Sequence, residues 1–287
     1  MGFIVLILLF CVALFVFLSH AFAWYEAANA SPELLEGRFR VRHLFFAINL
    51  LRKETLWLCC CLVSLPFGLL PQKRPPQEKT NGPPLIFLHG LFQNRACWWW
   101  LRFRLRCAGY SNQYSINLPF WRDIESLSEE VAKTVDQVRH RQEVDKVILI
   151  GHSMGGILAR NYIQRRGGTD RVSCCILLGT PNHGSKLVPF AVSRLARHLL
   201  PQSPFLLELN RNPFPQRVPL VNIFSWHDNL VLPPDNARLS SGREIELRSI
   251  GHAGLLFHSR TFHSITESLK EISACSQPTS PPESGSN

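Results

Sequence analysis

Apolar residues are distributed unevenly along this chain of 287 residues, and they divide it into a strongly apolar N-terminal part and a longer mixed part. Residues 1–25 contain no charged side chain, and "GFIVLILLFCVALFVFL" within them is almost entirely apolar. A second apolar run, "TLWLCCCLVSLPFGLLPQ" at 55–72, lies between Lys53 and Lys73. Because about 20 apolar residues span a bilayer as a helix, the first run predicts a membrane helix. The second run contains a proline and a glycine, and it could span, re-enter or lie in the interface.

From residue 85 onward, strand-like and helix-like stretches alternate, which predicts an α/β fold with a mainly parallel sheet flanked by helices. Runs rich in β-branched residues predict about six strands, at 84–90, 113–118, 146–150, 171–181, 219–228 and 243–252. Amphipathic stretches predict helices at 95–109, 126–142 and 157–166, and a last helix near the end of this part. Ser126 or Ser128 is the expected cap of the second helix.

Composition shifts place the boundaries between these parts. Residues 71–84, "PQKRPPQEKTNGPP", have proline at five positions and predict an extended linker. Residues 276–287, "SQPTSPPESGSN", predict a disordered tail. The expected organisation is therefore an N-terminal membrane-anchoring region at 1–70, the linker, an α/β domain at 85–275 and the tail.

The first apolar run fits either a retained transmembrane helix or a cleavable signal peptide. "AFA" at 21–23 has the small-x-small form of a cleavage site, whereas the absence of Lys or Arg before the run favours a retained helix. The basic residues between the two runs are Arg38, Arg40, Arg42, Arg52 and Lys53. If both runs span, the positive-inside rule places this loop in the cytoplasm and the α/β domain on the non-cytoplasmic side of a plasma or inner membrane.

Charge and cysteine usage narrow the function classes. The formal net charge is +10, but the basic residues are scattered and no nucleic-acid motif is present, so we expect a membrane surface and no nucleic acid as partner. The nine cysteines include no C-x-x-C pair, which argues against a zinc or thioredoxin-type site. Cys97 and Cys107 could pair, but mostly free, buried thiols are expected.

A glycine-rich turn stands between a predicted strand and a predicted helix in "VILIGHSMGGILAR", residues 147–160. The G-x-S-x-G pattern alone is weak, because chance supplies it in roughly one chain in ten of this length. A strand, a tight turn and a helix around it form a nucleophile elbow, in which only small residues fit two places either side of the serine. Gly151 and Gly155 occupy those places. Ser153 is thus a candidate nucleophile at a helix N-terminus.

A serine nucleophile needs a base that takes its proton and an acid that orients the base. In chain order, Asp228 and then His252 follow at the ends of predicted strands, where one crevice above the sheet could gather them. Asp235 is the alternative acid, although its context indicates a loop or cap. Four other histidines are weaker candidates, as structural, rim or last-helix residues: His152, His183, His258 and His263.

The oxyanion formed in acyl transfer needs hydrogen-bond donors that are already in place. One donor is usually the N–H of the residue after the nucleophile, here Met154. The second is expected from the loop after an early strand, where Gly90 in "FLHGLF" allows a close backbone approach and the N–H of Leu91 would point into the site. A simple turn is the alternative interpretation of this loop.

Residues 84–272 resemble the α/β-hydrolase fold, and specifically bacterial lipases of the triacylglycerol lipase type. The resemblance rests on "LHGLF", "GHSMGG", "LGTPNHGS" and "GHAGLLFH", with "SWHDNLVLPP" holding the acid. In small lipases of this group, the His of GH-x-x-LL is the base, and the Asp of D-x-x-V about 24 residues earlier is its partner. Asp228 precedes His252 by 24 residues and is followed by Val231.

The resemblance implies a catalytic triad and two backbone oxyanion donors. The triad is Ser153, Asp228 and His252, and the donors are Leu91 and Met154. No metal or cofactor is implied, since the paired-carboxylate calcium site of some larger lipases has no evident counterpart in this sequence. The resemblance does not cover residues 1–70.

Residues 187–217 fall outside the α/β pattern and predict a small cap insertion. "LVPFAVSRLARHLL" is apolar on one face and basic on the other, so the cap would suit a long acyl chain, with Arg194, Arg197 and His198 toward a phosphate or an anionic membrane. A helix packed on its own domain is the alternative. Likewise, "WWW" at 98–100 could line an acyl pocket or belong to the core.

These features predict a membrane-anchored lipase or esterase that cleaves carboxylic esters of apolar acyl groups. Its expected partners are a lipid or other apolar ester and a membrane. An acyltransferase or thioesterase with the same triad is the alternative enzyme, and a hydrolase-like membrane scaffold without catalysis is the alternative from another class.

Overall fold

The structure is a computed structural model, and it describes residues 2–30, 41–71 and 82–275. Most of the expected linker (72–81) and the whole expected tail (276–287) lie outside the described residues. The described residues form two N-terminal helices and the α/β part of the chain.

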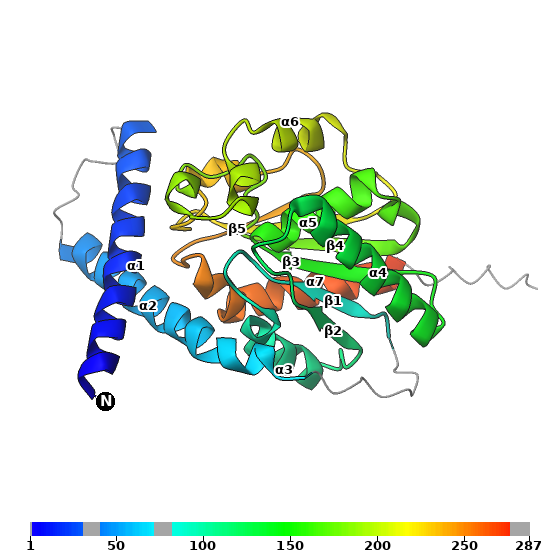
Figure 1. Cartoon of the computed structure of the whole chain (residues 1–287), viewed down its shortest axis with the longest axis horizontal. Helices are drawn as coiled ribbons and strands as arrows, with labels where there is room; N and C mark the ends of the chain where they lie inside the picture. Colours follow the sequence, from blue (N-terminus) through cyan, green and yellow to red (C-terminus); the bar gives the residue numbers. More distant parts are fainter. Residues whose placement is uncertain (1, 31–40, 72–81, 276–287) are drawn as a thin grey trace, which may run out of the picture.

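Six parallel strands form one sheet, in the order β2-β1-β3-β4-β5-β6 (Figure 1). The strands are β1 (Leu85–Leu88), β2 (Gln113–Ile116), β3 (Val147–His152), β4 (Val172–Leu178), β5 (Leu220–Ser225) and β6 (Arg243–Leu247). All five pairings are parallel. The prediction of about six strands in a mainly parallel sheet is confirmed, and each strand lies inside its predicted range apart from two residues at the end of β3.

Helices cover both faces of the sheet, and each face has its own hydrophobic core. Successive side chains of a strand point to opposite faces, so Ile86 and Leu88 of β1 join one core while Leu85 and Phe87 join the other. The helices α4 (Ile124–Gln142) and α5 (Met154–Arg165) cover the first face, and α3 (Trp99–Cys107) and α7 (Ser259–Cys275) cover the second. Because both of their faces are buried, the central strands β1, β3 and β4 are mostly apolar, whereas the edge strand β6 carries charged residues.

The cap of α4 differs from the prediction. Asp123, not Ser126 or Ser128, is the N-cap, and its carboxylate accepts the backbone N–H of Ser126 at 2.8 Å. The helix begins at Ile124, two residues before the predicted start, so Ser126 and Ser128 are helical and the acidic residue before them takes the capping role.

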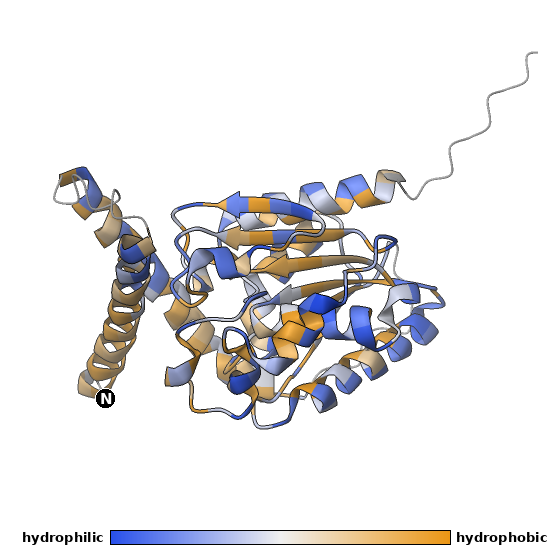
Figure 2. Cartoon of the chain, turned by 90° about the horizontal axis from the view of Figure 1, so that it is seen from above, coloured by the Kyte–Doolittle hydropathy of each residue, from blue (hydrophilic) through white to orange (hydrophobic). Residues whose placement is uncertain are grey.

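The N-terminal helix α1 (Gly2–Ala30) is apolar along most of its length (Figure 2). Among the described residues, it is the one helix long and apolar enough to cross a membrane, with a mean hydropathy of 3.0 over an 18-residue stretch. Its second half packs against the rest of the molecule and buries Val16, Ser19, His20 and Ala23. A membrane anchor and a signal sequence share this composition, so the interpretation depends on the contacts of that second half.

The second apolar run is part of one continuous helix, α2 (Val41–Leu69), with Pro66 inside it. In Figure 1, α2 crosses α1 and continues along the α/β part to end close to α3. Cys61 joins the core shared by α3 and α7, and the Trp57 ring stacks on Phe257 with 5.1 Å between centroids. Much of this apolar run therefore packs on the α/β part of the chain.

An insertion lies between β4 and β5, at the place where the sequence predicts a cap. It consists of two short 3₁₀ turns, η4 (Val188–Phe190) and η5 (Leu195–Leu199), and the helix α6 (Pro204–Arg211). The stretch "LVPFAVSRLARHLL" is thus not one helix. Leu195 and Leu199 are buried in the core of the α4–α5 face, whereas Phe190 and Val192 are exposed.

The eight cysteines whose side chains the structure describes are all free. Cys97 is buried and Cys107 is exposed, so the pairing considered for these two is not formed. Cys61, Cys174 and Cys175 are buried and pack as small apolar residues in the two cores.

Candidate active site

Ser153 lies at the sharp turn between β3 and α5. Its backbone has φ 55° and ψ −125°, a conformation that non-glycine residues rarely adopt and that costs of order 1–3 kcal/mol. A Cβ on Gly155 would lie 2.1 Å from the carbonyl oxygen of Leu88, so no other residue fits there unless β1 moves. The turn has the geometry of a nucleophile elbow, which places the serine just beyond the C-terminal end of β3.

Asp228 and His252 form a buried pair beyond the ends of β5 and β6. His252 Nδ1 lies 2.7 Å from Asp228 Oδ2. The other oxygen, Asp228 Oδ1, accepts the backbone N–H groups of Leu230 at 2.8 Å and Val231 at 2.9 Å. The carboxylate is therefore fixed on both sides, and it leaves Nε2 as the nitrogen of His252 that is available to a hydroxyl.

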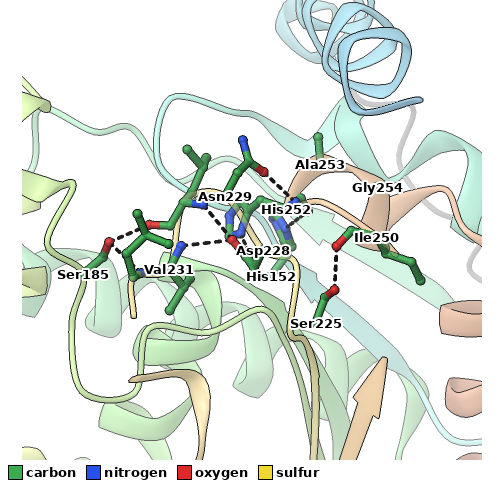
Figure 3. Close-up of polar contacts among 12 residues, drawn as sticks. His152, Ser185, Ser225, Asp228, Asn229, Val231, Ile250, His252, Ala253 and Gly254 are labelled. Atoms are coloured by element: carbon green, nitrogen blue, oxygen red, sulfur yellow. Dashed lines mark hydrogen bonds and ion pairs between the residues drawn. The ribbon is translucent and has the colours of Figure 1, made fainter. Parts of the chain in front are cut away.

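A neighbouring asparagine holds the backbone of His252 (Figure 3). Asn229 Oδ1 accepts the N–H of His252 at 3.0 Å, and its amide nitrogen donates to Ser19 Oγ on α1 at 2.7 Å. Ser225 Oγ donates to the carbonyl of Ile250 at 2.5 Å, which ties the end of β5 to the segment before His252. Acid, base and α1 thus belong to one hydrogen-bonded group.

The turn after β1 approaches Ser153. A Cβ on Gly90 would lie 3.0 Å from Ser153 Cβ and 3.3 Å from His152 Nδ1, so this backbone and the elbow are in close contact. Leu91 follows Gly90 in the turn, and Met154 is the first residue of α5, where a backbone N–H has no intrahelical acceptor. The two candidate oxyanion donors therefore flank the elbow.

Two side chains contact the backbone of the turn after β1 that carries the candidate oxyanion donor Leu91, which we call the oxyanion turn. His89 lies 2.8 Å from the carbonyl of Gly90 through Nδ1 and accepts the N–H of Leu118 through Nε2 at 2.8 Å. Gln93 Oε1 accepts the N–H of Gly90 and lies 3.2 Å from His152 Nδ1. These contacts fix the backbone around Gly90 without using Leu91.

The three buried histidines around the elbow differ in charge preference. Burial favours the neutral imidazole of His252, but the charge and hydrogen bond of Asp228, together with the charge of Glu54, outweigh it and raise the pKa of His252 above its usual value. Burial lowers the pKa of His89 to about 4, and burial with the nearby His252 lowers the pKa of His152 well below its usual value. Of the three, His252 is the one whose surroundings favour the imidazolium.

The weaker candidates lie elsewhere. Asp235 is in the 3₁₀ turn η6 (Pro234–Ala237), where its exposed carboxylate pairs with Arg238 at 3.0 Å. His258 caps α7 by accepting the N–H of Arg260, and His263 is within that helix. His183 Nδ1 lies 3.4 Å from the side-chain nitrogen of Asn210.

His152 differs from these histidines, because its ring centroid is 4.6 Å from that of His252 and its Nε2 lies 3.2 Å from the carbonyl oxygen of His252. Trp98 is fully buried beside Phe87, which is the core role considered for the first tryptophan of "WWW".

Within the described residues, no hydrogen bond joins the Ser153 hydroxyl to His252. Such bonds often tighten only when substrate binds.

Four residues of the site carried no usable signal in the sequence. Glu54 and Asn229 contact the segment around His252 from α2 and from the loop after β5. His89 and Gln93 contact backbone groups of the turn after β1, to which they themselves belong. No local pattern in the sequence identifies these backbone contacts. His89 was part of the "LHG" motif, but the carbonyl and N–H that it contacts could not be foreseen.

Comparison with known proteins agrees with this architecture. The family model described as alpha/beta hydrolase fold matches residues 83–221, a range that includes Ser153 and ends before Asp228. Lipase B of Aspergillus fumigatus superposes with a TM-score of 0.61 at 17% identity, over 74% of this chain and 60% of that one. The mature lipase BlEst2 of Bacillus licheniformis gives a TM-score of 0.55 at 20% identity, over 70% of this chain and 96% of that one.

The chain has the α/β-hydrolase fold. Methylesterase 7 of Arabidopsis thaliana is 28% identical over 89 residues, which cover 29% of this chain and 34% of that protein. The chain thus spans about a third of this curated relative and 60% of the lipase B chain. At these identities the similarity shows the fold, and the activity has to be argued from the site itself.

Proposed function

We propose that this α/β-hydrolase is a lipase or esterase that cleaves carboxylic esters of apolar acyl groups with Ser153 as nucleophile. The observation that carries the proposal is the buried Asp228–His252 pair, 2.7 Å apart, beside an elbow that holds Ser153 at φ 55°. The names of its relatives, a methylesterase and two lipases, support the same reaction class.

The proposed reaction has two halves. His252 takes the proton of Ser153 as the serine oxygen attacks the ester carbonyl, and Asp228 stabilises the imidazolium. The backbone N–H groups of Leu91 and Met154 bind the oxyanion. His252 then delivers the proton to the leaving alcohol. Water, activated by the same histidine, attacks the acyl-enzyme, releases the acid and restores Ser153.

An apolar rim beside the oxyanion turn supports an apolar substrate. The rim consists of five exposed residues, Phe92, Phe120, Trp121, Phe190 and Val192. Phe92 follows Leu91 directly and packs on Phe120, which contacts Trp121, with ring centroids 5.0 Å and 5.3 Å apart. An exposed apolar group of this kind marks a contact with lipid or another apolar partner.

The rim continues onto α1, which we propose as a retained membrane anchor. Phe190 packs on Phe22 with 5.5 Å between ring centroids, and Lys186 forms an ion pair with Glu26. Cleavage after "AFA" would remove the buried Ser19 that receives the Asn229 hydrogen bond. At 1.5 Å per residue, α1 is longer than the ~30 Å hydrocarbon core, so its packed second half would bring the rim to the membrane surface.

The same contacts bear on orientation. The expectation of a catalytic domain on the non-cytoplasmic side depended on both apolar runs spanning the membrane. The helix α2 instead packs on the catalytic domain and buries Glu54 against it. With α1 as the anchor, the arginines and lysines that follow it lie on the side of the catalytic domain. We infer from the positive-inside rule that this side is the cytoplasm.

Ester hydrolysis by the full chain tests the proposal. Ser153→Ala and the parent are assayed on a p-nitrophenyl ester, with Ser173→Ala as control because its hydroxyl only bonds the carbonyl of Val147 in the neighbouring strand. We expect the Ser153→Ala rate to fall at least about 10³-fold and the control to match the parent. Equal rates for all three proteins would refute the nucleophile, and faster cleavage of thioesters would favour the thioesterase alternative.

A further inference from the structure

A buried carboxylate on α2 contacts the turn that follows His252. Glu54 is 2% exposed, and its two oxygens accept the backbone N–H groups of Ala253 at 2.6 Å and Gly254 at 3.0 Å. These residues begin the 3₁₀ turn η7 (Ala253–Leu256), directly after the candidate base. A carboxylate taken from a separate helix thus satisfies two N–H groups at the start of this turn.

The glycines around His252 leave room for this carboxylate. A Cβ on Gly251 would lie 2.3 Å from both Glu54 Cδ and Oε2, and one on Gly254 would lie 3.1 Å from Oε2. Glu54 therefore fits against the backbone on both sides of His252. The Trp57–Phe257 stack, one helical turn further along α2, continues the same contact.

The other end of α2 touches the oxyanion turn. Gln93, which holds the N–H of Gly90, donates to Cys61 Sγ at 3.8 Å, and Asn94 donates to the carbonyl of Leu65 at 2.7 Å. One helix therefore supports the loop of the candidate base and the loop of the candidate oxyanion donors.

We propose that Glu54 is a positioning residue for His252, so that α2 is part of the catalytic apparatus as well as of the N-terminal region. The inference rests on the proposed function. The two hydrogen bonds of Glu54 fix the backbone at Ala253 and Gly254 and thereby the position of the His252 imidazole. The negative charge of Glu54 adds to that of Asp228 when His252 becomes an imidazolium.

Electrostatics agree with this role. Burial raises the pKa of Glu54 to about 7, against the two N–H groups and His252, which favour the carboxylate. The Glu54 carboxylate in turn contributes to the raised pKa of His252. The other ionisable groups near this pair come from five segments: Asp228, His152, His20 of α1, Lys53 and Cys61 of α2, and His258.

The test uses the full chain with Glu54→Gln, which keeps the size of the side chain but removes its charge and turns an NH₂ group toward a backbone N–H. We expect kcat to fall about tenfold with KM within about twofold, because the substrate is not contacted. Without the Glu54 charge, the pKa of His252 falls, so the acid limb of the kcat/KM profile moves to lower pH. Glu54→Asp keeps the charge, so its acid limb should stay nearer that of the parent.

Ser64→Ala is the matched control, since Ser64 is buried on the same helix but its hydroxyl bonds only the carbonyl of Cys61. Circular dichroism melts of all variants separate lost folding from lost positioning. A folded Glu54→Gln protein with the kcat and acid limb of the parent would overturn the inference.

The rate of labelling by a fluorophosphonate probe distinguishes the two levels of failure. If the parent is labelled no faster than Ser153→Ala, the proposed function is overturned, and the inference with it. A labelled parent with unchanged labelling of Glu54→Gln at every pH would overturn the inference alone. Slower labelling of Glu54→Gln, but not of Ser64→Ala, would support it.

Discussion

At the scale of single residues, the two oxygens of Asp228 have separate partners. Oδ1 accepts two backbone N–H groups, and Oδ2 faces Nδ1 of His252. We expect Asp228→Asn to keep the loop in place, because its amide oxygen can still accept from Leu230 and Val231. Its NH₂ group would favour the wrong tautomer of His252, and kcat should fall by about 10³–10⁴-fold in ester hydrolysis.

Asp235→Asn is the control for this substitution, because Asp235 was the alternative acid and its exposed carboxylate binds Arg238. It should keep the activity of the parent. A larger loss for Asp235→Asn than for Asp228→Asn would reverse the assignment of the acid.

The pH profile depends on one histidine. His252 must be neutral to accept a proton, and its pKa is raised, so kcat/KM should rise with pH through a pKa above the usual histidine value of 6.5. His89, with a pKa of about 4, and His152, lowered well below its usual value, stay neutral in this range. Rates between about pH 5 and 9 check this, and an acid limb below pH 6 in the parent would contradict the environment assigned to His252.

At the scale of elements, α2 and the segment before η7 are in tight contact at Gly251. A methyl group there would meet the Glu54 carboxylate at 2.3 Å, so Gly251→Ala must displace either α2 or the His252 loop. We expect kcat/KM to fall at least about tenfold. In a Glu54→Ala background the same substitution should cost less, because the clash is gone. An equal cost in both backgrounds would show that the contact does not matter.

The elements themselves were largely predictable, but their contacts were not. The runs at 146–150 and 219–228 are apolar and β-branched because their strands are buried on both faces, so pattern alone located β3 and β5. The pattern at 55–72 predicted an apolar segment but not that it packs on the α/β part of the chain. Glu54 binds a turn about 200 residues away, and no local pattern encodes that distance.

The candidate triad was predictable for a related reason. Ser153 stands in a turn that only small neighbours allow, and Asp228 and His252 follow strands whose ends meet at one edge of the sheet. The residues that support them act through backbone groups, as Asn229 does on the N–H of His252 and Gln93 on the N–H of Gly90. Their side chains look like ordinary loop residues in the sequence.

At the scale of the whole molecule, α1 and the apolar rim would face the same membrane. We expect Trp121→Glu with Val192→Glu to slow hydrolysis of a long-chain ester embedded in phosphatidylcholine vesicles about tenfold, because charged groups there disfavour contact with lipid. Hydrolysis of a short soluble ester should not change. Phe103→Glu, on the exposed side of α3, is the control. Equal losses on both substrates would show damage to the site instead of the surface.

The central claim is that Ser153 is an activated nucleophile in the intact chain. The most direct measurement is labelling of the full-length protein by a fluorophosphonate, followed by mass spectrometry of the digested protein. The account predicts one labelled peptide, with the adduct on Ser153, and strongly reduced labelling in Asp228→Asn. An adduct on another serine, or no adduct on a folded protein, would contradict it.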